Sequence, residues 1–306
     1  MKQRCEELLS QHVTDGVKGK KLIFKGLSEV DVYNITAPFD DHGREIIAGR
    51  VERRDSEQAT IHFFGKVSDL QWEVLPDYPT FELQDPFVTR INGELILGGV
   101  EIYPLPENPE ALGWRTIFYR GKDVMSLTRF FEGPKGMKDL RLAELVDGRI
   151  MVLTRPQGEF GGRGQIGLTY VNQLEELSHE LILAAPLLSQ FIPEEWGGAN
   201  AIYPLDSETV GVLGHIACFD EEECRHYYSM AFTINPKTGA YSEMKLVAVR
   251  AEFAAGEAKR PDLEDVIFSG GLVDRGDGSC DLYVGVGDSH AQVIKIDNPF
   301  TQLTSV

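Results

Sequence analysis

The chain has 306 residues, of which 42% are hydrophobic and 25% charged, and its formal net charge is −18 at pH 7. A field of this sign repels phosphate backbones and anionic lipid surfaces, which argues against a nucleic-acid-binding protein. No apolar run reaches the roughly 18–20 residues that span a bilayer. The first residues also lack the apolar core of a signal peptide. We therefore expect a soluble, cytoplasmic protein with no nucleic-acid or membrane partner.

The beginning of the chain has a helical pattern and the rest is typical of strands. Cys5, Leu8 and Leu9 have helical spacing and predict a short N-terminal helix over residues 3–12. After Gly19, short apolar segments bounded by Gly and Asp predict strands. Residues 172–191 break this pattern and predict an irregular or partly helical segment. No Pro-rich or Ser-rich linker divides the chain, so we expect one domain over residues 1–306.

A polar turn followed by an apolar strand recurs five times. The turns lie at 40–43, 91–93, 146–148, 205–208 and 276–278. An all-β repeat of roughly 50–70 residues is typical of a radial array of blades, so the fold class we predict is a five-bladed β-propeller. Each strand is expected to end at a polar residue, and equivalent positions of the blades converge on one axis. These residues are Arg50, Glu101, Arg155, His215 and Asp288.

A second set of small or polar positions precedes the five hairpins. Its members are Asn34, Asp85, Arg141, Asn200 and the pair Gly270–Gly271. An antiparallel hairpin brings the start of one strand beside the end of the next. We therefore expect Asn34 beside Arg50, Asp85 beside Glu101 and Arg141 beside Arg155, all at the rim of one face.

The residue types of this expected pocket suit a sugar and a phosphate. Arginine forks bind phosphate bidentately, and a histidine adds a further donor. Trp196, Tyr227 and Tyr228 could supply an aromatic platform for a sugar ring. The pattern suggests glycosyl transfer to or from phosphate.

Structural roles remain open for three of these residues. Arg141 could pair with Asp139 or Glu144, His215 could be a satisfied core histidine, and Trp196 could fill the core. The four cysteines are irregularly spaced, and the interval between Cys218 and Cys224 fits no usual zinc site. We expect no metal ion and no organic cofactor.

The ordered set of motifs resembles a known family. An Asn before the first hairpin and an Arg ending it are followed by Asp-Pro, a KD-R cluster, Arg-Pro, Gly-His and Gly-x-x-Asp. This order resembles the five-bladed propellers of inverting β-mannoside phosphorylases, glycoside hydrolase family 130, over about residues 30–296. The segments LQDPFVTRINGELILGG and GMKDLRLAELVDGRIMVLTRPQG look closer to the mannosyltransferase/phosphorylases of glycosyltransferase family 108, which build and degrade β-1,2-linked mannose oligomers.

The resemblance implies an activity and a role for each residue. Asp85 looks like the sole general acid, which acts through a mannose hydroxyl while inorganic phosphate, the co-substrate, attacks the anomeric carbon. Two further sets then bind the substrates. The phosphate set is Arg141, Arg155 and His215, with Tyr227 or Tyr228. For the saccharide set the resemblance supplies Asn34, Arg50 and Asp288, and the repeat pattern and residue types add Glu101, Trp196 and Asn200. Where these phosphorylases often carry a Lys, this chain has Trp196, which points to the mannosyltransferase-like subgroup.

The partners implied are a β-mannoside oligosaccharide and phosphate or mannose 1-phosphate. GDP-mannose as a donor, the acceptor length, the exact linkage and the oligomeric state stay open. Two other functions also stay open. One is an inverting or retaining glycosidase that uses Asp85, Glu101 and Asp288 as its carboxylates, and the other is a non-catalytic carbohydrate-binding propeller.

Overall fold

The computed structural model describes residues 2–301, and strands dominate it. About 50% of the residues lie in strands and 9% in helices. The expectation of a mostly β protein is therefore confirmed. Most neighbouring strands form antiparallel hairpins, and the five polar turns that the sequence predicts lie between paired strands.

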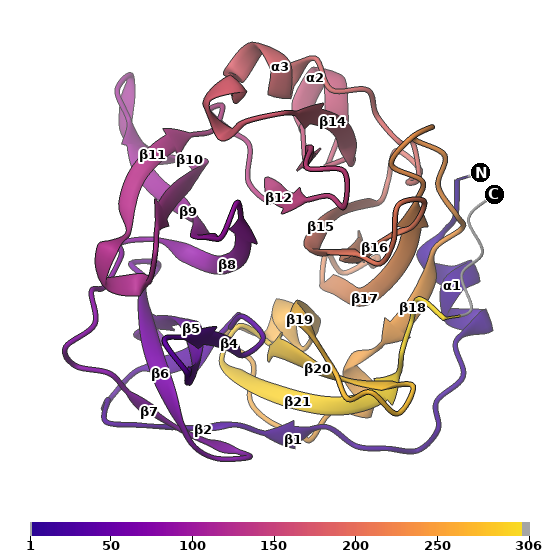
Figure 1. Ribbon diagram of the computed structural model, residues 1–306. Helices are drawn as coiled ribbons and strands as arrows, with labels where there is room; N and C mark the ends of the chain where they lie inside the picture. The colour runs from indigo at the N-terminus through magenta and orange to yellow at the C-terminus, as the bar shows by residue number, and fades with distance from the viewer. Residues whose placement is uncertain (1, 302–306) are drawn as a thin grey trace.

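Within residues 2–301 the strands fall into five consecutive groups, which we number in chain order (Figure 1). Group 1 contains β2 (Ile23–Lys25), β3 (Asp31–Tyr33), β4 (Phe39–Asp41), β5 (Arg44–Glu52), β6 (Thr60–Ser68) and β7 (Gln71–Val74). Group 2 contains β8 (Gln84–Ile91), β9 (Glu94–Leu105), β10 (Asn108–Gly121) and β11 (Thr128–Glu132). Group 3 contains β12 (Arg141–Glu144), β13 (Ile150–Thr154) and β14 (Gly167–Val171).

The last two groups share one sheet through a short parallel pairing. Group 4 contains β15 (Trp196–Pro204), β16 (Val210–Phe219), β17 (Arg225–Ile234) and β18 (Lys245–Ala248). Group 5 contains β19 (Asp265–Asp274), β20 (Ser279–Val286) and β21 (His290–Asp297), and it is completed by β1 (Lys20–Lys21) from the other end of the chain. The parallel pairing joins β17 to β19 at two positions only.

Helices are short and lie outside the sheets. The expected N-terminal helix is present as α1 (Cys5–Gln11), which packs Cys5 and Leu8 against group 4. The segment predicted to be irregular contains η2 (Leu174–Glu176) and α3 (His179–Leu183), which confirms that prediction. The remaining helical turns are α2 (Gly158–Gly161), η1 (Val124–Ser126), η3 (Arg250–Glu252) and η4 (Pro261–Leu263).

The hydrophobic core lies between neighbouring groups. Ile46 and Ile61 of group 1, for example, pack with Leu95 and Ile117 of group 2 in one buried cluster. Figure 1 shows the five groups around a common centre, with β8, β12, β15 and β19 facing it. Polar residues at the start of these inner strands are therefore brought together.

Three strands continue beyond the polar residue at which we expected them to end. Strand β5 runs on past Arg50, β9 past Glu101 and β16 past His215. Their partner strands are long enough to keep pairing: β9, for example, pairs with β10 as far as Leu105. The expected strand ends were therefore wrong at these three positions, which matters most for Glu101.

Irregular backbone at the inner strands turns polar side chains inward. Pairing of β8 with β9 shifts between Gln84 and Phe87, and pairing of β15 with β16 shifts between Ala199 and Ala201. Asp85 lies within the first of these bulges and Asn200 within the second. A bulge re-aims one side chain out of the regular alternation of a strand.

Candidate active site

A polar cavity of about 220 Å³ opens near the common centre of the groups. Five residues that the sequence singled out line it: Asn34, Arg50, Asp85, Tyr227 and Asp288. Other polar residues complete the lining: Glu57, Gln84, Lys138, Arg225, Lys259 and Arg260. The cavity thus combines residues of groups 1, 2, 4 and 5.

Asp85 is held by two donors from group 1. Its Oδ1 accepts a hydrogen bond from Asn34 Nδ2 at 2.9 Å and another from Arg50 Nη1 at 3.2 Å. Asn34 and Asp85 both have left-handed backbone, with φ of 42° and 50°. Asn and Asp tolerate this conformation better than most residues, and such strain concentrates at functional sites.

Asp288 also lines the cavity and has left-handed backbone, with φ of 51°. Burial raises the pKa of Asp288 above its usual value, and the nearby charge of Asp85 raises it further, whereas Arg50 opposes the shift. The surroundings of Asp288 therefore favour a retained proton.

Beside the cavity lies a buried cluster of cations around Asp139. Arg141 Nη2 lies 3.5 Å from Asp139 Oδ1, and Arg155 Nη1 lies 3.5 Å from Asp139 Oδ2. Although burial opposes ionisation, Arg155 and Arg141 hold the pKa of Asp139 below its usual value. Arg141 and Arg155 therefore approach each other as expected, and the Asp139 carboxylate lies between them. No sequence pattern indicates Asp139 as a site residue.

Backbone carbonyl groups of group 4 hold the two guanidinium groups in place. Arg141 Nε donates to Asn200 O at 2.8 Å, and Arg155 Nε donates to Gly197 O at 2.9 Å. His215 Nδ1 lies 2.9 Å from Asn200 Oδ1. Burial lowers the pKa of His215 to about 3, so its imidazole is neutral at ordinary pH.

Two donors in this cluster lack a hydrogen-bond partner among the described residues. They are Asn200 Nδ2 and Arg155 Nη1, both buried, although Arg155 Nη1 also lies 3.5 Å from Asp139 Oδ2 in the ion pair described above. Buried donors are normally satisfied, so a pair of unsatisfied ones beside two arginines marks a place where an anion or water would be stabilised.

Three residues expected at the site lie elsewhere. Glu101 faces the side of group 2, where its carboxylate pairs with Arg115 at 2.6 Å and with Arg129 at 3.2 Å. Trp196 is buried behind Tyr227, and its indole Nε1 donates to the Tyr227 hydroxyl at 2.9 Å. Tyr228 points to the opposite face of β17, where its hydroxyl donates to Asp265 at 3.0 Å.

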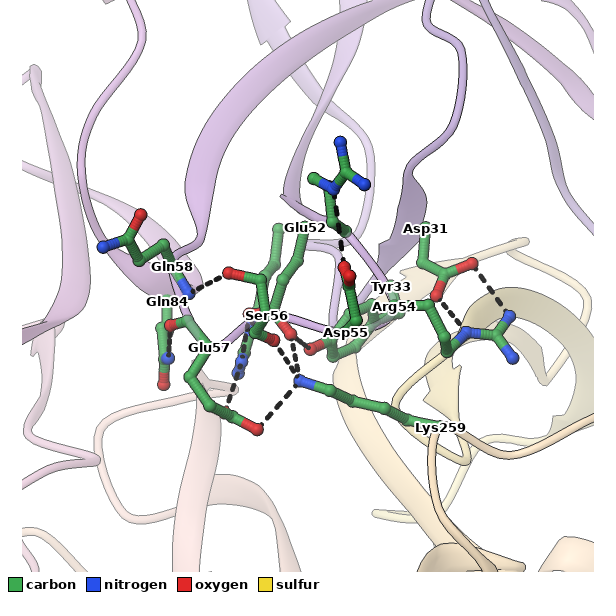
Figure 2. A network of polar contacts seen from close by, with 12 residues as sticks. Asp31, Tyr33, Glu52, Arg54, Asp55, Ser56, Glu57, Gln58, Gln84 and Lys259 are labelled. Atoms are coloured by element: carbon green, nitrogen blue, oxygen red, sulfur yellow. Dashed lines mark hydrogen bonds and ion pairs between the residues drawn. The ribbon is translucent and has the colours of Figure 1, made fainter.

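An ion network that no sequence pattern indicates supports Arg50. The ammonium group of Lys259 bonds to Glu52 and donates to Ser56 O at 2.7 Å and to Glu57 Oε1 at 3.0 Å (Figure 2). Glu52 in turn accepts from Arg50 Nη2 at 2.7 Å. The network therefore ties the segment after β18 to group 1 at the edge of the cavity.

One exposed group of side chains has the spacing of metal ligands. The ligand atoms of Asp220, Glu222 and Cys224 lie within 4.8 Å of one another. Asp220 Oδ1 already accepts hydrogen bonds from the backbone of Glu222 and Cys224, as in a polar turn. The group lies on the β16–β17 turn and contributes nothing to the cavity.

The helices of the described residues are short, which concerns the expectation that the protein has no membrane partner. Across residues 2–301, every helix is too short or too polar to cross a bilayer.

The comparisons with known proteins agree on one family. A family model described as "Protein of unknown function (DUF1861)" matches residues 10–302. A search of curated proteins found no match.

Two solved structures from Leishmania mexicana are similar to this chain over nearly its whole length. A mannose phosphorylase, solved with a phosphate ion, is 35% identical with a TM-score of 0.88, and the match covers 98% of this chain and 95% of that one. A GDP-Man-dependent mannosyltransferase is 31% identical with a TM-score of 0.88, and the match covers 99% and 97%. The resemblance drawn from the sequence motifs is thereby confirmed.

A more distant structure shares the fold alone. It is a β-1,2-mannobiose phosphorylase from Listeria innocua, solved with β-1,2-mannobiose, with 16% identity and a TM-score of 0.64. The match covers 89% of this chain and 92% of that one.

Proposed function

Because this chain belongs to the DUF1861 family and is a full-length relative of two mannose-transferring enzymes, we propose that it is a β-mannoside phosphorylase or mannosyltransferase. Its substrates are β-1,2-linked mannose oligosaccharides, and it moves mannose reversibly between phosphate and a sugar acceptor. The fold we propose for residues 1–306 is one five-bladed β-propeller, with groups 1 to 5 as its blades. The five consecutive antiparallel groups around one centre support this.

One observation carries the assignment. Asp85, clamped by Asn34 and Arg50, lines a polar cavity beside a buried cluster of Arg141 and Arg155 that has unsatisfied donors. Phosphate is already a nucleophile and needs cations to hold it, which the cluster of Arg141 and Arg155 would supply.

In the reaction we propose, Asp85 donates a proton through a mannose hydroxyl to the glycosidic oxygen. The bond from the anomeric carbon to that oxygen breaks as a phosphate oxygen attacks the opposite face, which gives α-mannose 1-phosphate and a shortened saccharide. Arg141 and Arg155 hold the phosphate, with His215 and Tyr227 beside them. Asn34, Arg50 and Asp288 hold the mannose.

The mannosyltransferase direction is the second candidate. The 31% identity to the GDP-Man-dependent enzyme over 99% of this chain favours testing GDP-mannose as a donor. Trp196, which stands where phosphorylases often carry a Lys, supports the same subgroup.

Phosphate-dependent breakdown of β-1,2-mannobiose tests the proposal. Mannose 1-phosphate should form only when inorganic phosphate is present. Release of free mannose at the same rate without phosphate would establish a hydrolase instead. If neither occurs, transfer from GDP-mannose to β-1,2-mannobiose is the remaining test, and its absence would leave a carbohydrate-binding protein.

A further inference from the structure

A second cavity, of about 530 Å³, lies beside the polar cavity, between groups 1 and 2. We call it the side cleft. Glu57 and Gln84 line both cavities. Gln84 Nε2 donates to Glu57 O at 3.1 Å, so the two residues form a shared wall, visible beside Lys259 in Figure 2.

The size of the polar cavity requires further space for an oligosaccharide. Ligand pockets usually have volumes of roughly 300–1,000 Å³, and the polar cavity, at about 220 Å³, lies below that range. The side cleft lies within it. The polar cavity therefore suits one sugar ring, and the adjoining sugars of a longer substrate must lie outside it.

The chemistry of inversion fixes the direction in which those sugars lie. Nucleophile and leaving group occupy opposite faces of the anomeric carbon in an inverting displacement. The proposed phosphate ligands Arg141 and Arg155 both belong to group 3, where Arg141 begins β12 and Arg155 directly follows β13. The acid Asp85 follows Gln84 directly, so the leaving sugar lies on the side of the shared wall.

The lining of the side cleft suits a saccharide. Its polar side chains can bond hydroxyl groups, and its aliphatic side chains can pack against the C–H faces of a sugar ring. Besides the shared wall, the polar lining residues include Gln58, Thr60 and Glu82, and the aliphatic ones include Leu83, Ile102 and Leu112.

From these observations we infer that the side cleft binds the acceptor-side mannosyl units of a β-1,2-linked oligosaccharide. This inference rests on the proposed function. Glu57 and Gln84 then lie at the junction between the transferred mannose and its acceptor. The length of acceptor that the enzyme prefers is set by this cleft and not by the polar cavity.

Leu112 allows a clean test, because its side chain is 49% exposed and its replacement should not disturb folding. Leu112→Trp fills the cleft, and Leu183→Trp is the matched control on α3, where the leucine is 55% exposed. We expect Leu112→Trp to raise the KM for β-1,2-mannobiose and β-1,2-mannotriose about tenfold, the effect of losing about 1.4 kcal/mol of binding. The KM for phosphate should change by less than about twofold, since uniform loss of acceptor binding leaves the other subsite intact.

Equal saccharide KM values in Leu112→Trp and Leu183→Trp would overturn the inference. A parallel rise in the KM for phosphate would also overturn it, because the cleft would then not be specific for the acceptor. If the wild type has no transfer activity, the proposed function fails separately, and calorimetric titration with β-1,2-mannotriose decides about the cleft. Weaker binding in Leu112→Trp alone supports it, and equal binding, or none in the wild type, overturns it.

Discussion

At the scale of single residues, the two aspartates of the cavity have different surroundings. Asp85 accepts hydrogen bonds from Asn34 and Arg50, whereas burial and the charge of Asp85 raise the pKa of Asp288. A general acid must hold its proton at working pH, and a raised pKa favours this. The sequence resemblance assigns the acid to Asp85, while the electrostatics draw attention to Asp288 as well.

Amide replacements separate the two aspartates. Asp85→Asn should lower kcat by a factor of roughly 10²–10⁴, the usual contribution of a general acid, without changing the melting temperature. Asp288→Asn keeps a polar group of the same shape and should mainly raise the saccharide KM. Steady-state kinetics of mannobiose phosphorolysis checks both. A larger kcat loss in Asp288→Asn than in Asp85→Asn would transfer the role of acid to Asp288.

The lowered pKa of His215 predicts a loss of stability in acid. The ordinary value is 6.5 and burial lowers the folded-state pKa to about 3. Between these values the unfolded chain takes up a proton that the folded chain does not. The free energy of unfolding should therefore fall as pH drops from about 6.5 towards 3, by at most about 1.4 kcal/mol per pH unit from this residue.

Urea unfolding at several pH values measures this effect. His215→Gln should reduce the slope of stability against pH below about 6.5 by up to one proton's contribution. His42→Gln is the control, because His42 is exposed and its bond to Asp123 raises its pKa, which gives the opposite sign. An unchanged slope in His215→Gln would mean that the imidazole protonates in the folded state.

At the scale of elements, the segment between β18 and β19 is held by the Lys259 network. The side chains of Lys259 and Glu52 are 6% and 1% exposed. Removing one member of a buried ion pair costs about 3–5 kcal/mol when the remaining charge is uncompensated, which is an upper limit here because Arg50 still pairs with Glu52 at 2.7 Å. The same loss would release Glu57, which forms part of the wall of the cavity.

Lys259→Met tests the network. It should lower the free energy of unfolding by more than a surface pair would and by up to about 3–5 kcal/mol in urea titrations. Lys237→Met is the matched control: Lys237 pairs with Glu208 at 3.0 Å, but both side chains are more than half exposed, and such pairs contribute about 1 kcal/mol or less. If the two variants lose equal stability, the pair between Lys259 and Glu52 contributes no more than a surface pair.

The hairpins could be predicted from the sequence because their determinants are local. Gly and Asp turns bounded by apolar segments identified the strand pairs, and the polar positions around them included Asn34, Arg50, Asp85 and Asp288. Which of two adjacent residues faces a site depends on register, since a shift of one residue reverses the face. For this reason the sequence left Tyr227 and Tyr228 undecided, and the structure turns only Tyr227 to the cavity.

Glu101 was expected at the site but lies elsewhere, whereas Lys259 and Asp139 were not expected there. In all three cases the position depends on non-local structure. Glu101 was expected at a strand end, but the long pairing of β9 with β10 carries it onto the side of group 2. Lys259 lies in an irregular segment without periodicity, and its partner Glu52 is 207 residues away in the sequence. Asp139 lies two residues before Arg141 in the sequence, where Arg141 was the expected site residue. Only the fold places Arg155 Nη1 near Asp139 Oδ2.

At the scale of the whole molecule, the first and last groups must meet to surround the site. Strand β1, from the beginning of the chain, pairs with β21 near its end. Gly270 and Gly285 of group 5 lie against Ile35 and Asn34 of group 1. A β-carbon on Gly270 would lie 1.8 Å from the backbone oxygen of Ile35, which cannot be accommodated without separating the two groups.

Gly270→Ala should therefore damage both stability and the site. We expect the free energy of unfolding to fall by about 3 kcal/mol or more, the upper range for overpacking, because the clash is with backbone and not with a movable side chain. Gly276→Ala is the control: its φ is +74° but a β-carbon there meets nothing within 4 Å, so only backbone strain of about 1–2 kcal/mol is expected. Since Ile35 follows Asn34, which holds Asp85, the folded fraction of Gly270→Ala should also show a lower kcat, whereas that of Gly276→Ala should not. Equal stability and equal kcat in the two variants would mean that groups 5 and 1 adjust to the added methyl group without moving Asp85.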